Sequence, residues 1–419
     1  MKDSQKNSLI RSWLALRGNP RACLYTEPMW GLSMNLCLPY ASVYMLGLGM
    51  NDVDVGFISS VYMFSQMIFS VLSGAIVDKL GRRKSTMIFD ILSWSLPSLI
   101  WASSQGFWFF VVAALFNGMM KITTVSWDCL LVEDAPKDKI TAIYSGVTVA
   151  GNLSALFAPI ASILVSKLTM VPAIRILYIN AFIVMTAKAL ILYHFSTETE
   201  VGKVRMEATK GMSWLELLAG YKGALKKVLS SRGMVFSIII SIVVEIIAML
   251  GTTFWQIIVS RRIGVADTLL PIFPMIRSVI SMLLFFTILA KINQSKLKMP
   301  LIGGFASTII AYVMVISITG TWWIGYVILF VSLAFEALAN GILYMLRESL
   351  VAIYVDPEDR SNIMALLQTI VMLISVPFGY IGGVLSDISR VLPFVLCVVL
   401  ALLGIGGTVL FYRKEPKTN

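Results

Sequence analysis

The stretch GAIVDKLGRRKS, residues 74–85, is a short polar segment with apolar sequence on both sides. It contains two glycines, an aspartate and three consecutive cations: Gly74, Asp78, Gly81, Arg82, Arg83 and Lys84. Gly81 permits a tight turn because glycine adopts positive φ without strain, and Gly74 permits two helices to approach closely. We therefore expect a short loop between two apolar helices, with Asp78 paired to a nearby cation.

The composition on either side of this loop is that of a membrane protein. Of 419 residues, 58% are hydrophobic and only 14% are charged, and the mean hydropathy is +0.83. A soluble protein has roughly 45–50% apolar and about 25% charged residues, so this chain has too much apolar surface for one globular core. The formal net charge of +11 does not indicate nucleic-acid binding, because the position of the cations in loops explains it. We expect the partners to be the lipid bilayer and a small molecule.

Apolar runs of about 20 residues, the length that crosses the hydrocarbon core, recur along the chain. The expected spans are residues 28–49, 54–77, 85–104, 107–132, 140–166, 172–194, 233–259, 267–290, 299–318, 322–348, 361–385 and 391–412. Segments of this length suit helices, which satisfy their own backbone hydrogen bonds in lipid. The predicted fold class is an all-α membrane protein with twelve transmembrane helices.

The orientation follows from the Lys and Arg residues, which favour cytoplasmic loops. Most of the 34 Lys and Arg residues lie in the N-terminal leader, the loops that follow the even-numbered spans, and the C-terminal tail. The opposite side has only Lys167, Arg175, Arg261, Arg262 and Arg390. We therefore expect both termini in the cytoplasm and the chain in the cell inner membrane as a multi-pass protein.

The spans fall into two sets of six, which predicts two pseudo-symmetric six-helix bundles. The expected parts are a leader (residues 1–27), an N-terminal bundle (28–194), a linker (195–232), a C-terminal bundle (233–412) and a tail (413–419). Residues 135–164 align without gaps with residues 356–385, a faint internal repeat. In the linker, SWLELLAGYKGALKKVLS predicts an amphipathic helix in the cytoplasmic interface, or else a solvated linker helix.

Residues 74–85 closely resemble the signature loop of the major facilitator superfamily, a family of transporters, with the six residues named above at the matching positions. The resemblance implies alternating access between two bundles, with the loop acting as a cytoplasmic latch through charge pairs between helices. Glu133 and Asp134 are the expected partners for Arg82 or Arg83. The equivalent segment of the second half, AKINQSKLK (residues 290–298), keeps the lysines but lacks the acidic-glycine core.

Two features depart from the proton-driven exporters of that family. Their fourth span has an arginine about four residues before a glycine, whereas here Ala114 precedes Gly118. Their glycine-rich fifth span appears here only as SALFAPIAS (residues 154–162), in which Pro159 is expected to kink the helix. Both departures weaken an antiporter assignment, although the family as a whole gives a small preference for export over import.

Charged residues inside apolar spans are the candidate transport site, because a charge in the bilayer costs several kcal/mol on insertion scales. The candidates for substrate binding or proton coupling are Lys121, Asp128, Glu245, Arg277 and Glu336. The alternative for these residues is structural, with ion pairs such as Glu245 with Arg277 or Glu336 with Lys121. Arg347 and Glu348 are candidate gate or snorkelling residues. Asp90 and Lys188 are left out because the resemblance makes their spans peripheral.

Secondary active transport of a small molecule, coupled to protons through carboxylates, is the expected function. His194, the only histidine, lies at the end of a span, which excludes a buried histidine relay. A membrane transferase is disfavoured because no loop gathers acid–base groups, and no Walker loop or metal-ligand spacing is present. We therefore expect no enzyme activity, no cofactor and a monomer. A lipid flippase and a non-transporting sensor on the same fold remain open alternatives.

Overall fold

The computed structural model describes residues 13–136, 139–213, 231–287, 297–320, 323–354 and 360–413. This part of the chain is helical, and strands are absent from it. Ten of its helices are long and apolar enough to cross a membrane. The chain is therefore an all-α membrane protein. The prediction of twelve helices is met in part, because the first and third expected spans are divided into shorter helical pieces.

The helices group by contact into two compact units. Unit 1 contains residues 1–38 and 65–219, and unit 2 contains residues 39–64 and 220–419. The helix α4 (Asp52–Leu80) is continuous and contributes residues to both units. Its N-terminus is fixed by reciprocal hydrogen bonds, from the Asp54 N–H to Asn51 Oδ1 at 2.8 Å and from the Asn51 N–H to Asp54 Oδ2 at 3.1 Å. The predicted division into two six-helix bundles remains a prediction.

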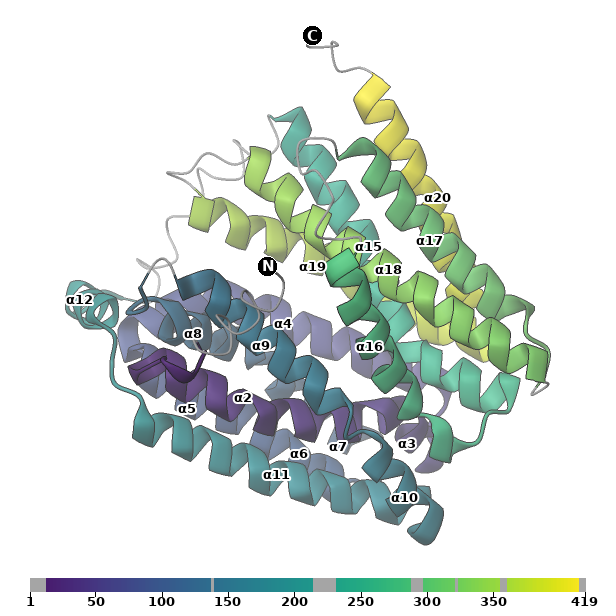
Figure 1. Ribbon diagram of the computed structural model, residues 1–419, viewed down its shortest axis with the longest axis horizontal. Helices are drawn as coiled ribbons and strands as arrows, with labels where there is room; N and C mark the ends of the chain where they lie inside the picture. The colour runs from purple at the N-terminus through teal and green to yellow at the C-terminus, as the bar shows by residue number, and fades with distance from the viewer. Residues whose placement is uncertain are drawn as a thin grey trace. The chain divides into compact units, whose positions relative to one another are not determined.

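Unit 1 is built around α2 (Gly18–Cys37), which packs most extensively against α11 and α9 (Figure 1). Its other helices are α5 (Arg82–Asp90), α6 (Leu96–Ser103), α7 (Phe107–Gly118), α8 (Met120–Val132), α9 (Ile140–Ala155), α10 (Pro159–Leu168), α11 (Met170–Phe195) and α12 (Glu200–Ala208). Pro159 begins α10, so the expected interruption of the fifth span is confirmed. The apolar side chains of Cys23, Leu130, Ile143 and Leu192 form part of the core of this unit.

Unit 2 has long apolar helices, which Figure 1 shows in teal, green and yellow. They are α15 (Arg232–Ile257), α16 (Ile272–Thr287), α17 (Lys298–Ser317), α18 (Trp323–Tyr354), α19 (Arg360–Ile388) and α20 (Leu392–Arg413), together with the short α3 (Ala41–Gly47). The α17 helix packs against both α18 and α20, and α15 packs against α18, α19 and α20. The three helices α15, α16 and α18 position the charged residues of this unit.

Two expected spans differ from the observed helices. The first was expected at residues 28–49, but α2 (Gly18–Cys37) begins earlier and a 3-10 turn, η1 (Leu38–Tyr40), separates it from α3. The third, expected at residues 85–104, is divided by a π-helical segment, η2 (Ile91–Ser95), between α5 and α6. Hydrophobic periodicity does not report a change of helix type, so these breaks were not predicted. The predicted amphipathic helix of the linker lies outside the described residues.

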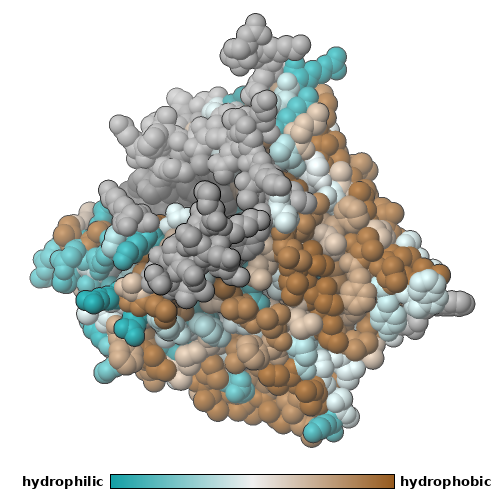
Figure 2. Space-filling view, in the orientation of Figure 1, coloured by the Kyte–Doolittle hydropathy of each residue, from teal (hydrophilic) through white to brown (hydrophobic). Residues whose placement is uncertain are grey.

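The outward faces of both units are apolar. Figure 2 shows hydrophobic residues spread over the visible face of the structure, including the region of α17 and α18. Exposed side chains include Ile179 and Ile183 of α11 and Val327 and Phe330 of α18. Exposed apolar helix faces of this kind are what a lipid environment requires, which agrees with the chain being a multi-pass membrane protein.

Candidate functional site

Arg277 and Glu336 form an ion pair between α16 and α18. Arg277 Nη2 lies 3.0 Å from Glu336 Oε2, and the Glu336 residue is only 6% exposed. The Arg277 guanidinium also lies over the Trp255 ring of α15, with its carbon 5.3 Å from the ring centroid. A buried carboxylate next to a cation and an aromatic face is stabilised electrostatically on two sides. The structural alternative named Lys121 as the partner of Glu336, whereas within unit 2 its partner is Arg277.

Glu245 pairs with Arg347 and not with Arg277. Arg347 Nη1 of α18 lies 2.5 Å from Glu245 Oε2 of α15. Glu336 and Arg347 are about three helical turns apart on α18, so they lie on one face of that helix. Sequence distance alone did not identify the correct partners, because the packing of α15, α16 and α18 decides which charges meet. The side chain of Glu348 lies outside the described residues.

Lys121 and Asp128 lie on α8 in unit 1 and are both half-buried. Their separation of about two helical turns places them on one face of the helix, as expected. Among the described residues, none donates a hydrogen bond to Asp128 or forms an ion pair with it. Asp128 is thus a carboxylate inside an apolar helix whose charge is not neutralised by a direct contact.

A third pair, which the sequence analysis left out, is the most deeply buried one. Lys188 Nζ of α11 lies 2.6 Å from Asp90 Oδ2 of α5, and the two side chains are 4% and 0% exposed. Glu27 of α2, which sequence reasoning did not select, is a further half-buried carboxylate of unit 1. Asp90 and Lys188 are charges within apolar runs, and that signal alone would have found them. The family analogy removed Asp90 and Lys188 from consideration.

The loop after α4 is held by a cluster of charges within unit 1. Gly81 adopts a positive φ of 83°, which confirms the expected turn. The backbone N–H groups of Arg82 and Arg83 donate to the Glu198 carboxylate at 2.8 and 3.1 Å. Glu198 therefore occupies the N-terminus of α5, where unpaired N–H groups and the helix dipole favour an anion.

Arg82 joins this loop to α8. Its guanidinium contacts Asp78 at 3.0 Å and Glu133 at 3.2 Å, and Thr199 Oγ1 donates to Glu133. Burial lowers the pKa of Arg82, but the hydrogen bonds and charges of Glu133 and Asp78 outweigh this and raise the pKa above its ordinary value. The guanidinium is therefore protonated at any physiological pH. These five residues (Asp78, Arg82, Glu133, Glu198 and Thr199) are called the Arg82 cluster below.

The remaining loop residues have different surroundings. The Arg83 guanidinium donates to the Tyr193 carbonyl through Nε at 3.0 Å and through Nη2 at 2.8 Å. Asp134 was expected to pair with the basic loop, but this pairing is not observed. It accepts instead from Asn19 Nδ2 at 3.3 Å. Lys84 is exposed, and a Cβ at Gly74 would meet none of the described residues within 4 Å, so the expected close helix approach at Gly74 is not observed.

A second polar cluster lies in unit 2, at the first residue of α4. Asp52 Oδ2 accepts from Ser386 Oγ at 2.6 Å and from Arg390 Nε at 3.2 Å. One turn further along α4, Gly56 crosses α19 so closely that a Cβ there would lie 2.4 Å from the Gly379 carbonyl oxygen. Asp52, Ser386 and Arg390 are called the Asp52 cluster. Sequence reasoning missed it because it depends on which helices cross.

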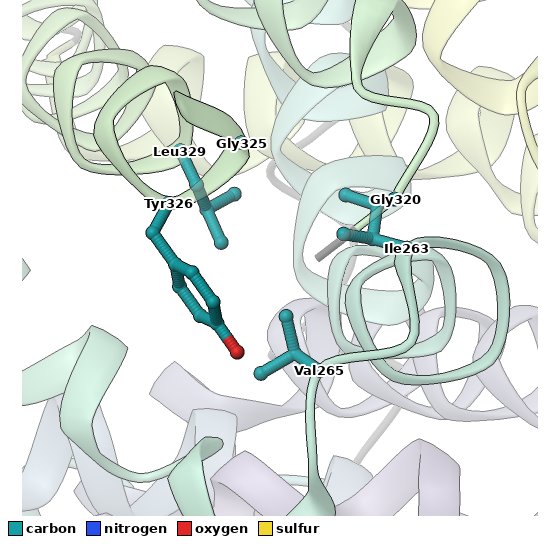
Figure 3. Close-up of a pocket in the computed structure, with 6 residues that line it drawn as sticks. All are labelled: Ile263, Val265, Gly320, Gly325, Tyr326 and Leu329. Atoms are coloured by element: carbon teal, nitrogen blue, oxygen red, sulfur yellow. The ribbon is translucent and has the colours of Figure 1, made fainter. Parts of the chain in front are cut away.

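An apolar depression elsewhere in unit 2 has no such chemistry. It is lined by Ile263, Val265, Gly320, Gly325, Tyr326 and Leu329. Figure 3 shows the Tyr326 ring lying beside it, with its hydroxyl directed toward Val265. The lining includes no charged group, so the ion pairs of α15, α16 and α18 are the stronger candidates for a polar substrate.

Comparison with known proteins found a matching family model and several similar proteins. The family model described as Major Facilitator Superfamily matches residues 29–351. The quinolone resistance protein NorA of Staphylococcus aureus is 28% identical over 88 residues. That match covers 21% of this chain and 22% of NorA, so only about a fifth of the relative's length is matched.

Solved transporters share the fold at low sequence identity. The nucleoside transporter NupG has a TM-score of 0.70 at 15% identity, over 95% of this chain and 100% of that chain. A POT family transporter in complex with a thioalcohol-conjugated peptide has a TM-score of 0.69 at 14% identity, over 97% and 100%. The xylose transporter XylE from E. coli has a TM-score of 0.66 at 13% identity, over 96% of each chain.

Proposed function

The chain belongs to the Major Facilitator Superfamily, and from this premise we propose that it moves a small organic molecule across the cytoplasmic membrane by alternating access. Proton coupling and export are part of the proposal, as are a monomeric state and a cytoplasmic location for both termini. The observation that carries it is the pair of ion pairs, Arg277–Glu336 and Glu245–Arg347, inside the apolar helices of unit 2. Placing a charge inside a bilayer costs free energy, so charged residues there are functional candidates by default. These ion pairs therefore favour a role in binding a polar substrate or a proton.

The substrate class is taken from chemistry shared by the relatives. NorA is named for quinolone resistance, which supports export, and the solved structures with this fold are named for nucleosides, peptides and xylose. All of these are small molecules with several polar groups. Arg277, stacked on Trp255 and paired with Glu336, would offer such a molecule a cation and an aromatic face.

The two charge clusters are proposed to act as latches. In the predicted orientation the Arg82 cluster faces the cytoplasm and the Asp52 cluster faces the opposite side. Alternating access requires that contacts at one end separate while those at the other end form. Asp52, which accepts from Ser386 of α19 and from Arg390, is the contact that we propose to open in one of the two states.

Flux into proteoliposomes with an imposed pH gradient tests the proposal. The probes are a fluorescent quinolone and radiolabelled uridine, xylose and a dipeptide. We expect a gradient-driven flux of at least one probe that a protonophore abolishes, and a reduced flux in Asp128→Asn, Glu245→Gln or Glu336→Gln. Glu207→Gln, at an exposed position on α12, is the matched control. If all three carboxylate variants keep the full gradient-driven flux, proton coupling through these residues is wrong.

A further inference from the structure

The ion pair between α16 and α18 leaves one donor of Arg277 without an acceptor. Glu336 Oε2 accepts from Arg277 Nη2 at 3.0 Å. The Nε atom of Arg277 is buried and has no hydrogen-bond partner among the described residues. A buried donor without an acceptor costs free energy, because it loses its hydrogen bonds to water and gains none in return. The hydrogen bonding of Arg277 is therefore incomplete.

The indole of Trp255 beside this guanidinium also lacks an acceptor. Trp255 is only 2% exposed, and its Nε1 atom has no partner in the part of the chain that the structure describes. A buried tryptophan usually finds an acceptor for its N–H. The guanidinium carbon of Arg277 lies 5.3 Å from the centroid of the Trp255 ring. The two N–H groups therefore lie within the dimensions of one small molecule.

These two donors differ from the buried hydroxyls that lack a partner. A serine or threonine hydroxyl rotates to suit its surroundings, whereas the direction of an indole N–H or a guanidinium Nε–H is fixed by the plane of its group. Four donors of the fixed kind have no partner among the described residues, and they belong to Trp127, Arg175, Trp255 and Arg277. Trp255 and Arg277 are in contact with each other, so a single ligand can satisfy both.

The charge balance around these donors decides which acceptor fits them. Glu336 already neutralises Arg277, and the side chain of Glu336 is only 8% exposed. The other charged residues of this region, Glu245 and Arg347, are paired with each other. A further carboxylate or phosphate would leave a net negative charge in a low-dielectric environment, which is costly. An uncharged carbonyl oxygen accepts from N–H donors without adding a charge.

We propose that Arg277 Nε and Trp255 Nε1 bind an uncharged carbonyl group of the transported molecule, such as that of an amide or an imide. The inference rests on the proposed function and narrows its substrate to neutral carbonyl compounds. Glu336 is a positioning residue, because its bond to Nη2 fixes the plane in which the Nε–H lies. Since 27% of the Arg277 side chain is exposed, the molecule meets the guanidinium before it meets the buried indole.

Equilibrium binding to the purified full-length protein tests the site. The neutral carbonyl probes are radiolabelled uridine and a dipeptide that is acetylated at its N-terminus and amidated at its C-terminus. Trp255→Phe keeps an aromatic ring but lacks the indole N–H, and Trp323→Phe, at a position that is 74% exposed, is the matched control. At least one carbonyl probe should bind the wild type, and Trp255→Phe alone should weaken that binding by about three- to tenfold, as for one lost hydrogen bond.

A second variant and a charged probe make the test independent of one substitution. Arg277→Lys keeps a cation beside Glu336 but lacks the Nε–H, so it should weaken binding of the same carbonyl probe. Unchanged affinity in both Trp255→Phe and Arg277→Lys overturns the proposal. Uridine monophosphate carries the same carbonyl groups as uridine together with a negative charge. Tighter binding of uridine monophosphate than of uridine would show that the site takes an anion, which also overturns the proposal.

Flux measurements separate this inference from the proposed function. Xylose, which in its ring form has hydroxyl groups and no carbonyl, is the comparison probe. If neither carbonyl probe binds the wild type at millimolar concentration, the inference is overturned, and transport of xylose by the same protein leaves the proposed function standing. A wild type that transports none of the probes but binds a carbonyl probe less tightly after Trp255→Phe overturns the proposed function and leaves the binding site in place.

Discussion

At the scale of single residues, the Glu198 carboxylate occupies the position of a bound anion at the N-terminus of α5. Its carboxylate accepts from the N–H groups of Arg82 and Arg83, while a Cβ at Gly81 would lie 2.5 Å from its Oε2. The loop therefore has space for this carboxylate only because residue 81 is glycine.

Replacing Glu198 by alanine should destabilise the protein by about 1–3 kcal/mol, because two backbone donors lose their acceptor. Glu207→Ala, an exposed glutamate on the neighbouring helix α12, is the control and should change little. Thermal unfolding of both variants in detergent measures the difference. Equal unfolding temperatures for the two variants would show that water replaces the Glu198 carboxylate at no cost.

The Arg277–Glu336 pair allows a second test at the residue scale. Arg277→Met alone leaves a buried carboxylate unpaired and should cost about 3–5 kcal/mol. Adding Glu336→Leu removes that unpaired charge and should restore most of the stability, without restoring transport. Unfolding curves of the single and double variants measure the stability, and probe flux through the same variants measures transport. Full flux in the double variant would show that the Arg277–Glu336 pair has only a structural role.

Residue identities were easier to predict than residue partners. Glu133 was expected to pair with the basic loop, and it does contact Arg82. Both residues lie beside short loops, and the positions of those loops are fixed by the apolar spans that they connect. The structural alternative named Arg277 as the partner of Glu245, but Glu245 contacts Arg347. The rotation of α15 against α18 decides this, and it is set by packing across the whole interface and not by local sequence. Glu27 shows a third case, since its position near a predicted helix end concealed that it lies inside a longer helix.

At the scale of elements, the crossing of α4 and α19 depends on glycine. Gly56 faces Gly379 and Gly383, and a Cβ at Gly383 would lie 2.8 Å from the Asp52 carbonyl oxygen. The hydroxyl of Ser60 completes the crossing by donating to the Val376 carbonyl at 2.6 Å and accepting from the Tyr380 N–H at 2.8 Å.

Gly56→Val should push these two helices apart, because the backbone atoms opposite it cannot yield as a flexible side chain would. We expect the Asp52 cluster to loosen and a cysteine at Ser386 to react faster with a maleimide than in the parent. Gly406→Val on α20, where a Cβ meets none of the described residues within 4 Å, is the matched control. An unchanged labelling rate in Gly56→Val would contradict the close crossing.

Helix existence was predictable from apolar runs, while helix continuity was not. Ten helices of the described chain have the length and hydropathy of a membrane span. The divisions at η1 and η2, and the short helix α12 that holds the Arg82 cluster, arise from tertiary contacts that leave no periodic signal. Thr199 caps α12, because its Oγ1 accepts from the Gly202 N–H at 2.9 Å.

At the scale of the whole molecule, the distribution of cations predicts which ends of the helices meet the cytoplasm. Lys84 and Lys167 are both exposed and lie on opposite predicted sides. In a variant in which the four native cysteines are replaced, a cysteine at residue 84 should react with an impermeant maleimide only in everted vesicles. A cysteine at residue 167 should react only in right-side-out vesicles. The reverse pattern would show that the predicted topology is inverted. The proposed roles of the Arg82 cluster and the Asp52 cluster would then be exchanged.

The continuity of α4 has a mechanical consequence. One helix bears Asp52 on its first turn and Asp78 near its last, a separation of roughly 39 Å at 1.5 Å per residue. No break in hydrogen bonding lies between these aspartates to absorb a tilt. A rod of this kind behaves as a lever: when it swings at one tip, the other tip is displaced in the same stroke, so a movement at Asp52 reaches Asp78 through a single piece of backbone.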